Sequence, residues 1–323
     1  MRAIQVETAG GPEVLHLVDA PKPTAADDAV LVRNMFAGVN YIDTYHREGR
    51  YPLELPFIPG QEGAGVIEEI GAAVSGWSVG DRVAWAMVPS SYAEYVSVPA
   101  RLLARIPAGV SEELAAAVML QGLTAHYLVT SVYAADQTTT AVVHAAAGGV
   151  GLLLTQMLKA RGATVIGTVS SEEKVARALE AGADHVIRYD EEPWEEKTRE
   201  LVGDKKVDVV YDGVGQSTFE AGLTVLRPRG LMAIYGAASG AVPPFDLQRL
   251  NGLGSLVITR PSLGDFLRTP DELAWRVEDI FGSVRAGTLS VSIAKTFPLN
   301  QAAEAHRAIE SRRYSGKLLL FSG

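Results

Sequence analysis

The chain is 323 residues long, with 47% hydrophobic and 21% charged residues, a globular balance that leaves little room for disorder and suits two domains. Its formal net charge of −9 disfavours general nucleic-acid binding, because a negative surface repels phosphate backbones. The chain has no cysteine, which excludes disulfides, iron–sulfur clusters, thiol nucleophiles and thiolate zinc sites.

The first stretch, residues 1–6, is interrupted by polar side chains and is typical of a strand, not of a signal peptide. No apolar run reaches the roughly 18 residues that a membrane helix needs. We therefore expect a cytoplasmic protein with no membrane partner.

Short alternating stretches broken by glycine and proline fill the chain up to about residue 122, for example Ala29–Arg33 and Gly65–Gly71. This pattern predicts a mostly antiparallel β domain. Towards its end the pattern changes. Ser111, followed by Glu112 and Glu113, is typical of a helix N-cap with acidic residues in the first turn.

Strands and helices alternate over residues 123–263. Continuous apolar runs indicate buried parallel strands, and segments with helical spacing separate them. The strands are expected at residues 141–145, 163–169, 185–187, 207–211, 230–235 and 255–259, with helices at 151–160 and 174–181. This alternation predicts one doubly wound, Rossmann-type parallel sheet.

The last part of the chain, residues 264–323, returns to mixed structure. We expect helices at 271–286 and 301–311 and a final strand at 317–321. Because this tail is too short to fold alone, we expect it to pack on the N-terminal domain. The prediction is an α/β protein in which residues 1–122 and 264–323 form one domain and residues 123–263 the other.

A glycine-rich segment, His144–Gly151, ends the first predicted Rossmann strand and opens a helix. It has the form A-x-G-x-x-G, with Ala146, Gly148 and Gly151 in the three special positions. The first makes the tight turn, the second lets backbone N–H groups approach a pyrophosphate, and the third lets the helix pack closely on the strand. A plain structural turn is the alternative, but the strand–helix context favours dinucleotide binding.

The end of the second predicted strand indicates which dinucleotide binds. An NAD site usually places a carboxylate there to bind the ribose 2′-hydroxyl, whereas this strand ends Gly167–Ser171 with Lys174 following. Hydroxyls and a cation favour the 2′-phosphate of NADP, with Arg188 and Tyr189 nearby. We expect the neighbouring pair of glutamates, 172 and 173, to point outward. The alternative is that Lys174 is merely a solvated helix residue.

Aromatic side chains recur in Asn40–Tyr45 and Gly49–Pro52, which follow a predicted strand. In a polar turn such residues suit a flat ring substrate. A loop plugged by its own aromatic residues is the alternative.

Taken together, several short segments resemble the zinc-less quinone oxidoreductase (zeta-crystallin-like) branch of the medium-chain dehydrogenase/reductases. They occur in order from end to end of the chain, at residues 10–15, 40–45, 80–83, 121–125, 144–151 and 259–263. The resemblance implies a GroES-like, mostly β catalytic domain beside the Rossmann domain.

The resemblance also bears on metal binding. Zinc alcohol dehydrogenases of the wider family have Gly-His-Glu where this chain has Gly60-Gln61-Glu62, and a carboxamide is a poor zinc ligand. The stretch Met87–Tyr92 also lacks a cysteine-rich lobe. We therefore expect no metal.

The resemblance implies contacts to NADPH at each part of the cofactor. The pyrophosphate is expected at the glycine-rich loop, the adenosine phosphate at the ends of the second and third strands, and the nicotinamide near residues of both domains. The residues are Gly148, Gly149 and Val150 for the pyrophosphate; Gly167, Ser170, Lys174, Tyr189 and, from the tail, Lys317 for the adenosine end; and Asn40, Thr124, Tyr127 and Tyr235 for the nicotinamide.

We expect the acceptor to be lined by Asn40, Tyr45, Tyr51 and Arg260, which would donate hydrogen bonds to its oxygen. The expected function is NADPH-dependent reduction of quinones without a metal. One alternative is an NADPH-dependent 2-alkenal or enone double-bond reductase. An alternative from another class is a non-catalytic NADPH- or RNA-binding protein. The resemblance also implies a homodimer joined through an edge strand, here residues 255–259.

Overall fold

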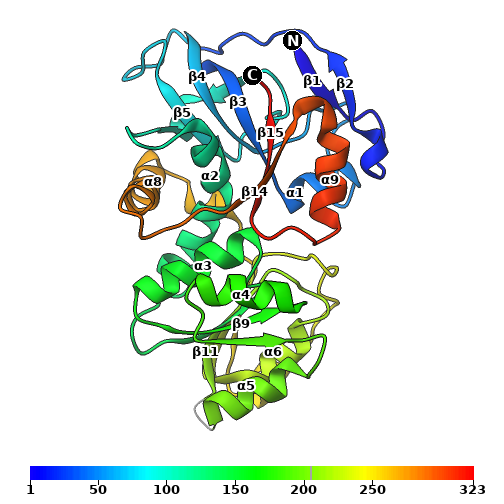
Figure 1. Ribbon diagram of the computed structural model, residues 1–323, viewed down its shortest axis with the longest axis vertical. Coiled ribbons are helices and arrows are strands. Elements are labelled where there is room, and N and C mark those ends of the chain that lie inside the picture. Colours follow the sequence, from blue (N-terminus) through cyan, green and yellow to red (C-terminus); the bar gives the residue numbers. More distant parts are fainter. Residues whose placement is uncertain (204–205) are drawn as a thin grey trace. The chain divides into compact units, whose positions relative to one another are not determined.

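A computed structural model describes residues 1–203 and 206–323 of the chain. The chain divides into two compact units, coloured along the sequence in Figure 1. The first unit comprises Met1–Leu123 and Leu267–Gly323, and the second comprises Thr124–Phe266.

The first unit is built on a seven-stranded sheet with the order β14-β15-β3-β4-β5-β7, in which β6 also pairs with β3. The strands are β3 (Ala29–Val39), β4 (Glu62–Ile70), β5 (Arg82–Ala86), β6 (Tyr95–Pro99), β7 (Leu103–Arg105), β14 (Ile293–Pro298) and β15 (Lys317–Phe321). A separate antiparallel pair is formed by β1 (Arg2–Gln5) and β2 (His16–Asp19). The prediction of a mostly antiparallel β domain is confirmed, with β14 and β15 as a parallel pair within it.

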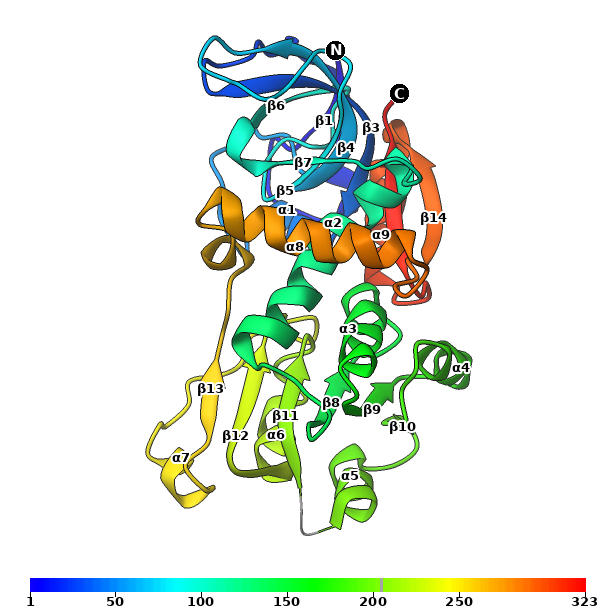
Figure 2. The same ribbon diagram turned by 90° about the vertical axis from the view of Figure 1, so that its left-hand side faces the viewer.

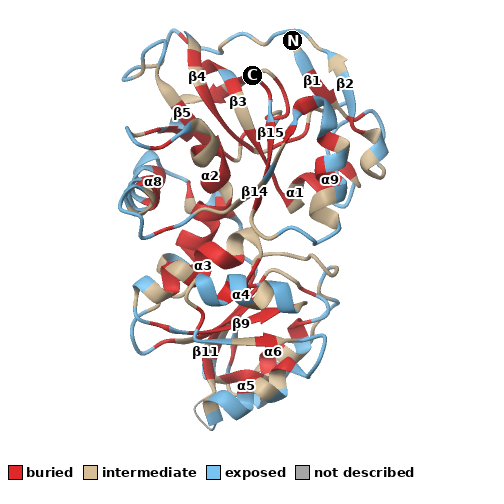
Figure 3. Ribbon diagram, in the orientation of Figure 1, coloured by how far each residue is buried: buried red, intermediate tan, exposed pale blue. Residues whose placement is uncertain are grey.

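In the described part of this unit, β3 contributes to two clusters of buried side chains, because it is long enough to reach both. Val30 and Val32 pack with Trp85 in one cluster, while Ala37 and Val39 pack with Leu318 and neighbouring side chains in the other. Figure 3 shows the buried residues gathered along β3, β4 and β15.

The tail joins this sheet directly. Strand β15 pairs antiparallel with β3, so the last strand of the chain lies between β14 and β3. The tail also supplies helices α8 (Pro270–Arg285) and α9 (Ala302–Glu310). The expectation that this segment packs on the N-terminal part of the chain is confirmed.

The segment after β3 is a helix, not the polar turn that the sequence predicts. Helix α1 spans Tyr41–Arg47. At its start, the Asp43 carboxylate accepts a hydrogen bond from the backbone N–H of Asn40 at 2.9 Å. Acidic residues in the first turn stabilise a helix N-terminus, which explains why seven residues suffice here.

Helix α2 (Glu112–Tyr127) begins where the sequence places it. Ser111 Oγ accepts the N–H of Leu114 at 3.1 Å, which confirms the expected N-cap. The helical span Glu112–Val132, which includes η3 (Leu128–Val132), is long and apolar enough to cross a membrane. However, 72% of its most apolar window is buried in the fold, as in the core helix of a globular protein.

The second unit is a six-stranded parallel sheet with the order β10-β9-β8-β11-β12-β13, seen edge to edge in Figure 2. The strands are β8 (Thr140–His144), β9 (Thr164–Val169), β10 (His185–Arg188), β11 (Val207–Asp212), β12 (Leu226–Ile234) and β13 (Val257–Thr259). Numbered within this unit, the order is 3-2-1-4-5-6, which is the Rossmann arrangement. The predicted fold class is therefore confirmed.

Helices connect these parallel strands. They are α3 (Gly149–Ala160), α4 (Glu172–Glu180), α5 (Trp194–Val202), α6 (Phe219–Val225) and α7 (Arg249–Gly252). Gly182, just after α4, has a φ of +99° and is the predicted C′ glycine. Short turns of 3-10 helix occur at η1 (Pro12–Val14), η2 (Ala100–Leu102), η5 (Leu263–Phe266) and η6 (Leu299–Gln301).

Candidate active site

The glycine-rich loop lies at the carboxyl end of β8, between that strand and α3. Strands β9 and β11 flank β8 on its two sides, so the direction of winding reverses next to this loop. Ligands of open α/β sheets bind at such a switch point. Gly148 is the N-cap of α3 and provides no side-chain cap, so the first-turn N–H groups of this helix are available to an anion.

The glycines of this loop serve different purposes. A Cβ on Gly151 would collide with the backbone of Ala145 and Ala146, so this glycine lets α3 pack against the strand end, as predicted. A Cβ on Gly148 would come no closer than 3.1 Å to Ala145 O, and the φ of Gly148 is −79°, which any residue adopts. The fold therefore demands glycine less strongly at 148 than at 151, which fits a cradle for a ligand.

Gly167 lies on β9 and is buried. A Cβ there would come within 2.8 Å of the Ala146 side chain. The contact gives Gly167 a packing role beneath the loop, beside its predicted role in cofactor binding.

The rim at the end of β9 has the chemistry expected for a 2′-phosphate. Lys174 Nζ donates to Ser170 Oγ at 2.8 Å, which places a cation and a hydroxyl together. Glu172 is 78% exposed at its side chain and pairs with Arg188 at 3.1 Å, so the expected outward direction of this carboxylate is confirmed. Tyr189 is 42% exposed, and its N–H donates to Val169 O.

Arg188 is less suited to the phosphate than its position suggests. Its guanidinium also pairs with Asp190 at 2.9 Å and with Glu191 at 2.7 Å. These acidic partners hold the pKa of Arg188 above its usual value, first through the Asp190 hydrogen bond, and they neutralise the charge.

Asp212 is a site residue that sequence reasoning missed. It is buried at the end of β11, beside the loop. Its carboxylate accepts the N–H groups of Val214 at 2.7 Å and Gly215 at 3.0 Å, and the hydroxyl of Thr218 at 2.8 Å. Asp212 therefore shapes the turn that faces the switch point. The Asp-Gly-Val-Gly sequence, which is typical of an Asx turn after a strand, was the available signal.

The second unit also contains four residues predicted near the nicotinamide or the acceptor. Tyr127 is 2% exposed and stacks on Phe266, with ring centroids 4.4 Å apart. Arg260 donates to Ile234 O at 3.1 Å. Burial raises the pKa of Tyr127 and of Tyr235, so both phenols are neutral at physiological pH. Thr124 is buried on the same helix as Tyr127.

In the first unit, Asn40 is 4% exposed and its amide is already engaged. Asn40 Nδ2 donates to Glu62 at 2.8 Å, and Oδ1 accepts from Lys317 Nζ at 2.8 Å. Lys317 Nζ also forms a buried ion pair with Glu62. These contacts give Lys317 a carboxylate partner inside the first unit instead of the predicted cofactor phosphate. They also favour a structural role for the Asn40 amide.

Glu62 completes this buried cluster and was not predicted as a site residue. Its second carboxylate oxygen accepts the N–H of Leu120, on α2, at 2.6 Å. A Cβ on Gly38 would collide with both Glu62 and Lys317, so glycine is required there. The cluster thus ties β4, β15 and α2 to the amino end of α1.

Tyr45 and Tyr51 form an edge-to-face pair with ring centroids 5.5 Å apart. Tyr45 is 8% exposed and Tyr51 41%, so Tyr51 presents an aromatic surface that Tyr45 supports from below. The guanidinium of Arg50 lies over the Tyr45 ring at 5.6 Å. The structure therefore brings the two predicted acceptor tyrosines together.

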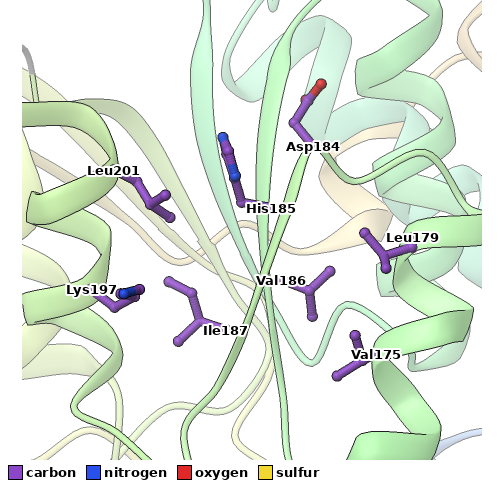
Figure 4. A pocket seen from close by; sticks show the side chains of 8 residues that line it. All are labelled: Val175, Leu179, Asp184, His185, Val186, Ile187, Lys197 and Leu201. Atoms are coloured by element: carbon purple, nitrogen blue, oxygen red, sulfur yellow. The ribbon is translucent and has the colours of Figure 1, made fainter.

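Over residues 1–203 and 206–323, no three histidine, aspartate or glutamate side chains gather in a way that could hold a metal ion. A hollow of about 370 Å³ lies elsewhere, around the edge strand β10. Figure 4 shows His185 and Ile187 on the side of α5, and Val186 on the side of α4. None of the predicted site residues lines it.

Comparison with known proteins identifies two family models in the chain. The family model described as "Alcohol dehydrogenase GroES-like domain" matches residues 26–108, and that described as "Zinc-binding dehydrogenase" matches residues 149–277. The quinone oxidoreductase of Pseudomonas aeruginosa is 42% identical over 321 residues, covering 99% of both chains. The chain belongs to the quinone oxidoreductases of the medium-chain dehydrogenase/reductase family.

Solved structures of this family share the fold of the chain. The Escherichia coli quinone oxidoreductase complexed with NADPH superposes with a TM-score of 0.97 at 41% identity, covering 99% of this chain and 100% of that one. The 2-haloacrylate reductase of a Burkholderia species is 38% identical over 98% of each chain. The resemblance stated from the sequence motifs is thereby confirmed. The second family is described as zinc-binding, but this chain has no cysteine that could be a zinc ligand.

Proposed function

We propose that this protein is an NADPH-dependent quinone oxidoreductase that works without a metal. The observation that carries the proposal is the paired Ser170 hydroxyl and Lys174 ammonium at the end of β9, beside a glycine cradle. A carboxylate at that strand end would repel a 2′-phosphate, and the nearest one, Glu172, points outward. Family membership supplies the acceptor class, since the relatives are named for quinone reduction.

The residues of the second unit would hold NADPH, which supplies a hydride when bound. The loop N–H groups of Gly148, Gly149 and Val150 would bind the pyrophosphate at the start of α3. Ser170 and Lys174 would bind the 2′-phosphate, and Tyr189 would lie against the adenosine. Tyr127, stacked on Phe266, and Tyr235 would form a neutral aromatic wall for the nicotinamide.

For quinone reduction, the protein must orient the acceptor, and this matters more than supplying an acid or a base. Tyr51 would stack on the acceptor ring while Tyr45 supports it. The balanced reaction takes one proton from solvent: NADPH, quinone and H⁺ give NADP⁺ and hydroquinone.

Calorimetric titration of the pure protein with NADPH and with NADH tests the cofactor assignment. We expect tight binding of NADPH and weaker binding of NADH. Absence of heat with both cofactors would contradict the whole proposal, and preference for NADH would remove only the 2′-phosphate site.

A second candidate function is reduction of a conjugated carbon–carbon double bond. The relationship to a 2-haloacrylate reductase favours it, because that substrate name denotes an activated alkene. Turnover of NADPH with 1,4-benzoquinone, 9,10-phenanthrenequinone, acrolein and trans-2-nonenal separates the two functions. Quinone turnover alone supports the first proposal, and alkenal turnover alone supports the second.

A non-catalytic role in binding NADPH or RNA is the remaining alternative from the sequence. The net charge of −9 opposes RNA binding. A mobility-shift assay at physiological salt with no shift, together with quinone turnover, would exclude this role.

We also infer a cytoplasmic homodimer that pairs through β13. This strand is the edge of the Rossmann sheet, and its Val257 is 48% exposed. An apolar edge strand is suited to pairing with a twofold mate. Sedimentation of the wild type as a dimer, and of Val257→Asp as a monomer, is the expected result.

A further inference from the structure

A buried chain of hydrogen bonds runs through the first unit and is not used in the proposed reaction. Tyr92 Oη lies 3.0 Å from Asp43 Oδ2, His306 Nε2 lies 3.2 Å from Tyr92 Oη, and Arg47 Nη1 lies 3.0 Å from His306 Nδ1. The four residues are each at most 1% exposed. They come from α1, from the segment before β6, and from α9.

The direction of these bonds follows from their donors. A guanidinium only donates, so His306 Nδ1 accepts from Arg47 and the ring proton is on Nε2. His306 then donates to Tyr92, and Tyr92 donates to Asp43. Burial, and then the Arg47 charge, lower the pKa of His306 to about 3, so the ring is neutral at physiological pH.

The chain of hydrogen bonds ends on a buried carboxylate, that of Asp43. Asp43 Oδ2 accepts from Tyr92 and from the backbone of Asn40, while Oδ1 has no hydrogen-bond partner in the described structure. Asp43 and Glu62 are negative when ionised, and Lys317 and Arg47 are positive. Lys317 pairs directly with Glu62, and Arg47 pairs directly with Glu48 and Glu310. Among the residues that the structure describes, Asp43 therefore has no ion-pair partner of its own, and its ionised form depends on the hydrogen bonds from Tyr92 and from the Asn40 backbone.

The Asp43 end of this chain of hydrogen bonds lies next to residues of the predicted acceptor site. Asp43 holds the N–H of Asn40 at the start of α1, and the Asn40 amide contacts Glu62 and Lys317. One turn further along the same helix lies Tyr45, the partner of Tyr51. The orientation of this tyrosine pair therefore depends on how the first turn of α1 is fixed.

We propose that Tyr92 and His306 are positioning residues of the acceptor site, which link Arg47 to Asp43 and so fix the amino end of α1 beneath Tyr45. The inference rests on the proposed function, since it assigns the tyrosines of α1 to the acceptor.

The charged and titratable groups around Asp43 allow a test by pH. Lys317 on β15, Glu62 on β4 and Tyr92 face Asp43, and Arg47 and His306 face Tyr92. At the outer end, Glu48 and Glu310 pair with Arg47. Burial raises the pKa of Asp43 to about 7, whereas the Tyr92 hydrogen bond lowers it. A proton taken up by Asp43 goes to Oδ1, the oxygen without a partner, and leaves a buried O–H without an acceptor.

The first experiment determines the tautomer of His306 in the intact protein, by long-range ¹H–¹⁵N correlation of the imidazole. We expect the Nε2–H form, unchanged between pH 5 and 9. An Nδ1–H ring, or a ring that takes up a proton in this range, would overturn the proposal.

The second experiment compares Tyr92→Phe with Tyr95→Phe, a matched control on β6 three residues away. With Tyr92→Phe, we expect kcat/KM for the quinone to fall by about tenfold to a hundredfold, and the Kd for NADPH to stay within about twofold. The acidic limb of its pH profile should move to higher pH, because the variant loses a hydrogen bond that lowers the Asp43 pKa. Tyr95→Phe should match the wild type.

His306 offers a conservative rescue. His306→Gln keeps an N–H that can reach Tyr92, and His306→Ala does not, with His16→Gln on the exposed strand β2 as control. We expect kcat/KM to rank wild type, then His306→Gln, then His306→Ala, in variants that remain folded. An unchanged acidic limb in Tyr92→Phe, or equal activity of the two His306 variants, would overturn the inference. Failure of the proposed function would instead appear as absent turnover in the wild type.

Discussion

Asp43 and His306 have pKa values that burial moves in opposite directions. Asp43 rises from 3.8 to about 7, and His306 falls from 6.5 to about 3. Asp43 alone contributes stability that is fully present below 3.8 and is lost as pH rises through 7. His306 alone contributes stability that is present above 6.5 and is lost as pH falls through 3. Between about pH 4 and 6.5 the pair holds one proton in either state, on Asp43 when folded and on His306 when unfolded.

Substitution of either residue should therefore reveal the pH dependence of stability that the other residue contributes. In His306→Gln, the free energy of unfolding should fall, relative to wild type, as pH rises from about 4 to 7. In Asp43→Asn it should rise with pH over about 3 to 6.5. Each slope is at most about 1.4 kcal/mol per pH unit. Urea unfolding at half-unit pH steps measures both, and slopes of the same sign in the two variants would contradict the assignment.

Alanine substitutions at Gly148 and Gly151 should have different effects, the first mainly on NADPH binding and the second mainly on stability. We expect Gly151→Ala to lose about 1–3 kcal/mol of unfolding free energy, because its Cβ meets backbone that cannot move away. Gly148→Ala should lose less stability than Gly151→Ala, since its φ of −79° is ordinary and its Cβ would meet one carbonyl oxygen at 3.1 Å, but it should bind NADPH more weakly. Thermal unfolding and calorimetry check the pair, and an unstable Gly148→Ala would show that this glycine is structural.

Lys174 should determine the choice between cofactors. Charged hydrogen bonds contribute about 1.5–3 kcal/mol, so Lys174→Ala should weaken NADPH binding by about tenfold or more and leave NADH nearly unchanged. Lys197→Ala, which removes an exposed lysine of α5, is the matched control. Equal losses for both cofactors in Lys174→Ala would place the 2′-phosphate elsewhere.

Among the elements, those with a strong local pattern could be predicted from sequence. The glycine loop, α3, β9 and the start of α2 depend on neighbouring residues, on apolar runs and on caps. Helix α1 was predicted as a turn because seven residues give no clear helical period. Its N-terminus depends on Asp43, whose other partner Tyr92 is 49 residues away along the chain.

The same reasoning explains why some contacts of the predicted site residues could not be foreseen. Asn40 and Lys317 were assigned by family resemblance to cofactor or acceptor, yet they meet each other and Glu62 across 277 and 255 residues of sequence. Contacts of that span depend on how β4 and β15 are placed in one sheet. No local spacing in the sequence reports it.

The Glu62–Lys317 pair should act as a clamp between β4 and β15. Lys317→Met leaves Glu62 buried without its cation, and removal of one partner from such a pair costs about 3–5 kcal/mol. The double variant Glu62→Gln/Lys317→Met should lose less than Lys317→Met alone, because no charge is stranded. Urea unfolding of the single and double variants measures this, and additive losses would mean that the two side chains act independently.

At the scale of the whole molecule, the fold class could be predicted from the sequence pattern, which shows short β segments followed by a regular alternation of strand and helix. The doubly wound parallel sheet is confirmed, because continuous apolar runs separated by helical segments are typical of it. The strand order 3-2-1-4-5-6 within it is an observation of the structure. The parallel pairing of β14 with β15 was not predicted, since it depends on the return of the chain after the second unit.

The position of β15 between β14 and β3 has a consequence for biosynthesis. The second unit is one continuous segment, Thr124–Phe266, and can finish folding while the ribosome is still at work. The first unit cannot, because the position beside β3 stays empty until Lys317–Phe321 leaves the exit tunnel. The N-terminal part of the first unit therefore stays incompletely folded until the C-terminal strand has been synthesised. During that interval, the unpaired edge of β3 is the part of the molecule that a chaperone would protect.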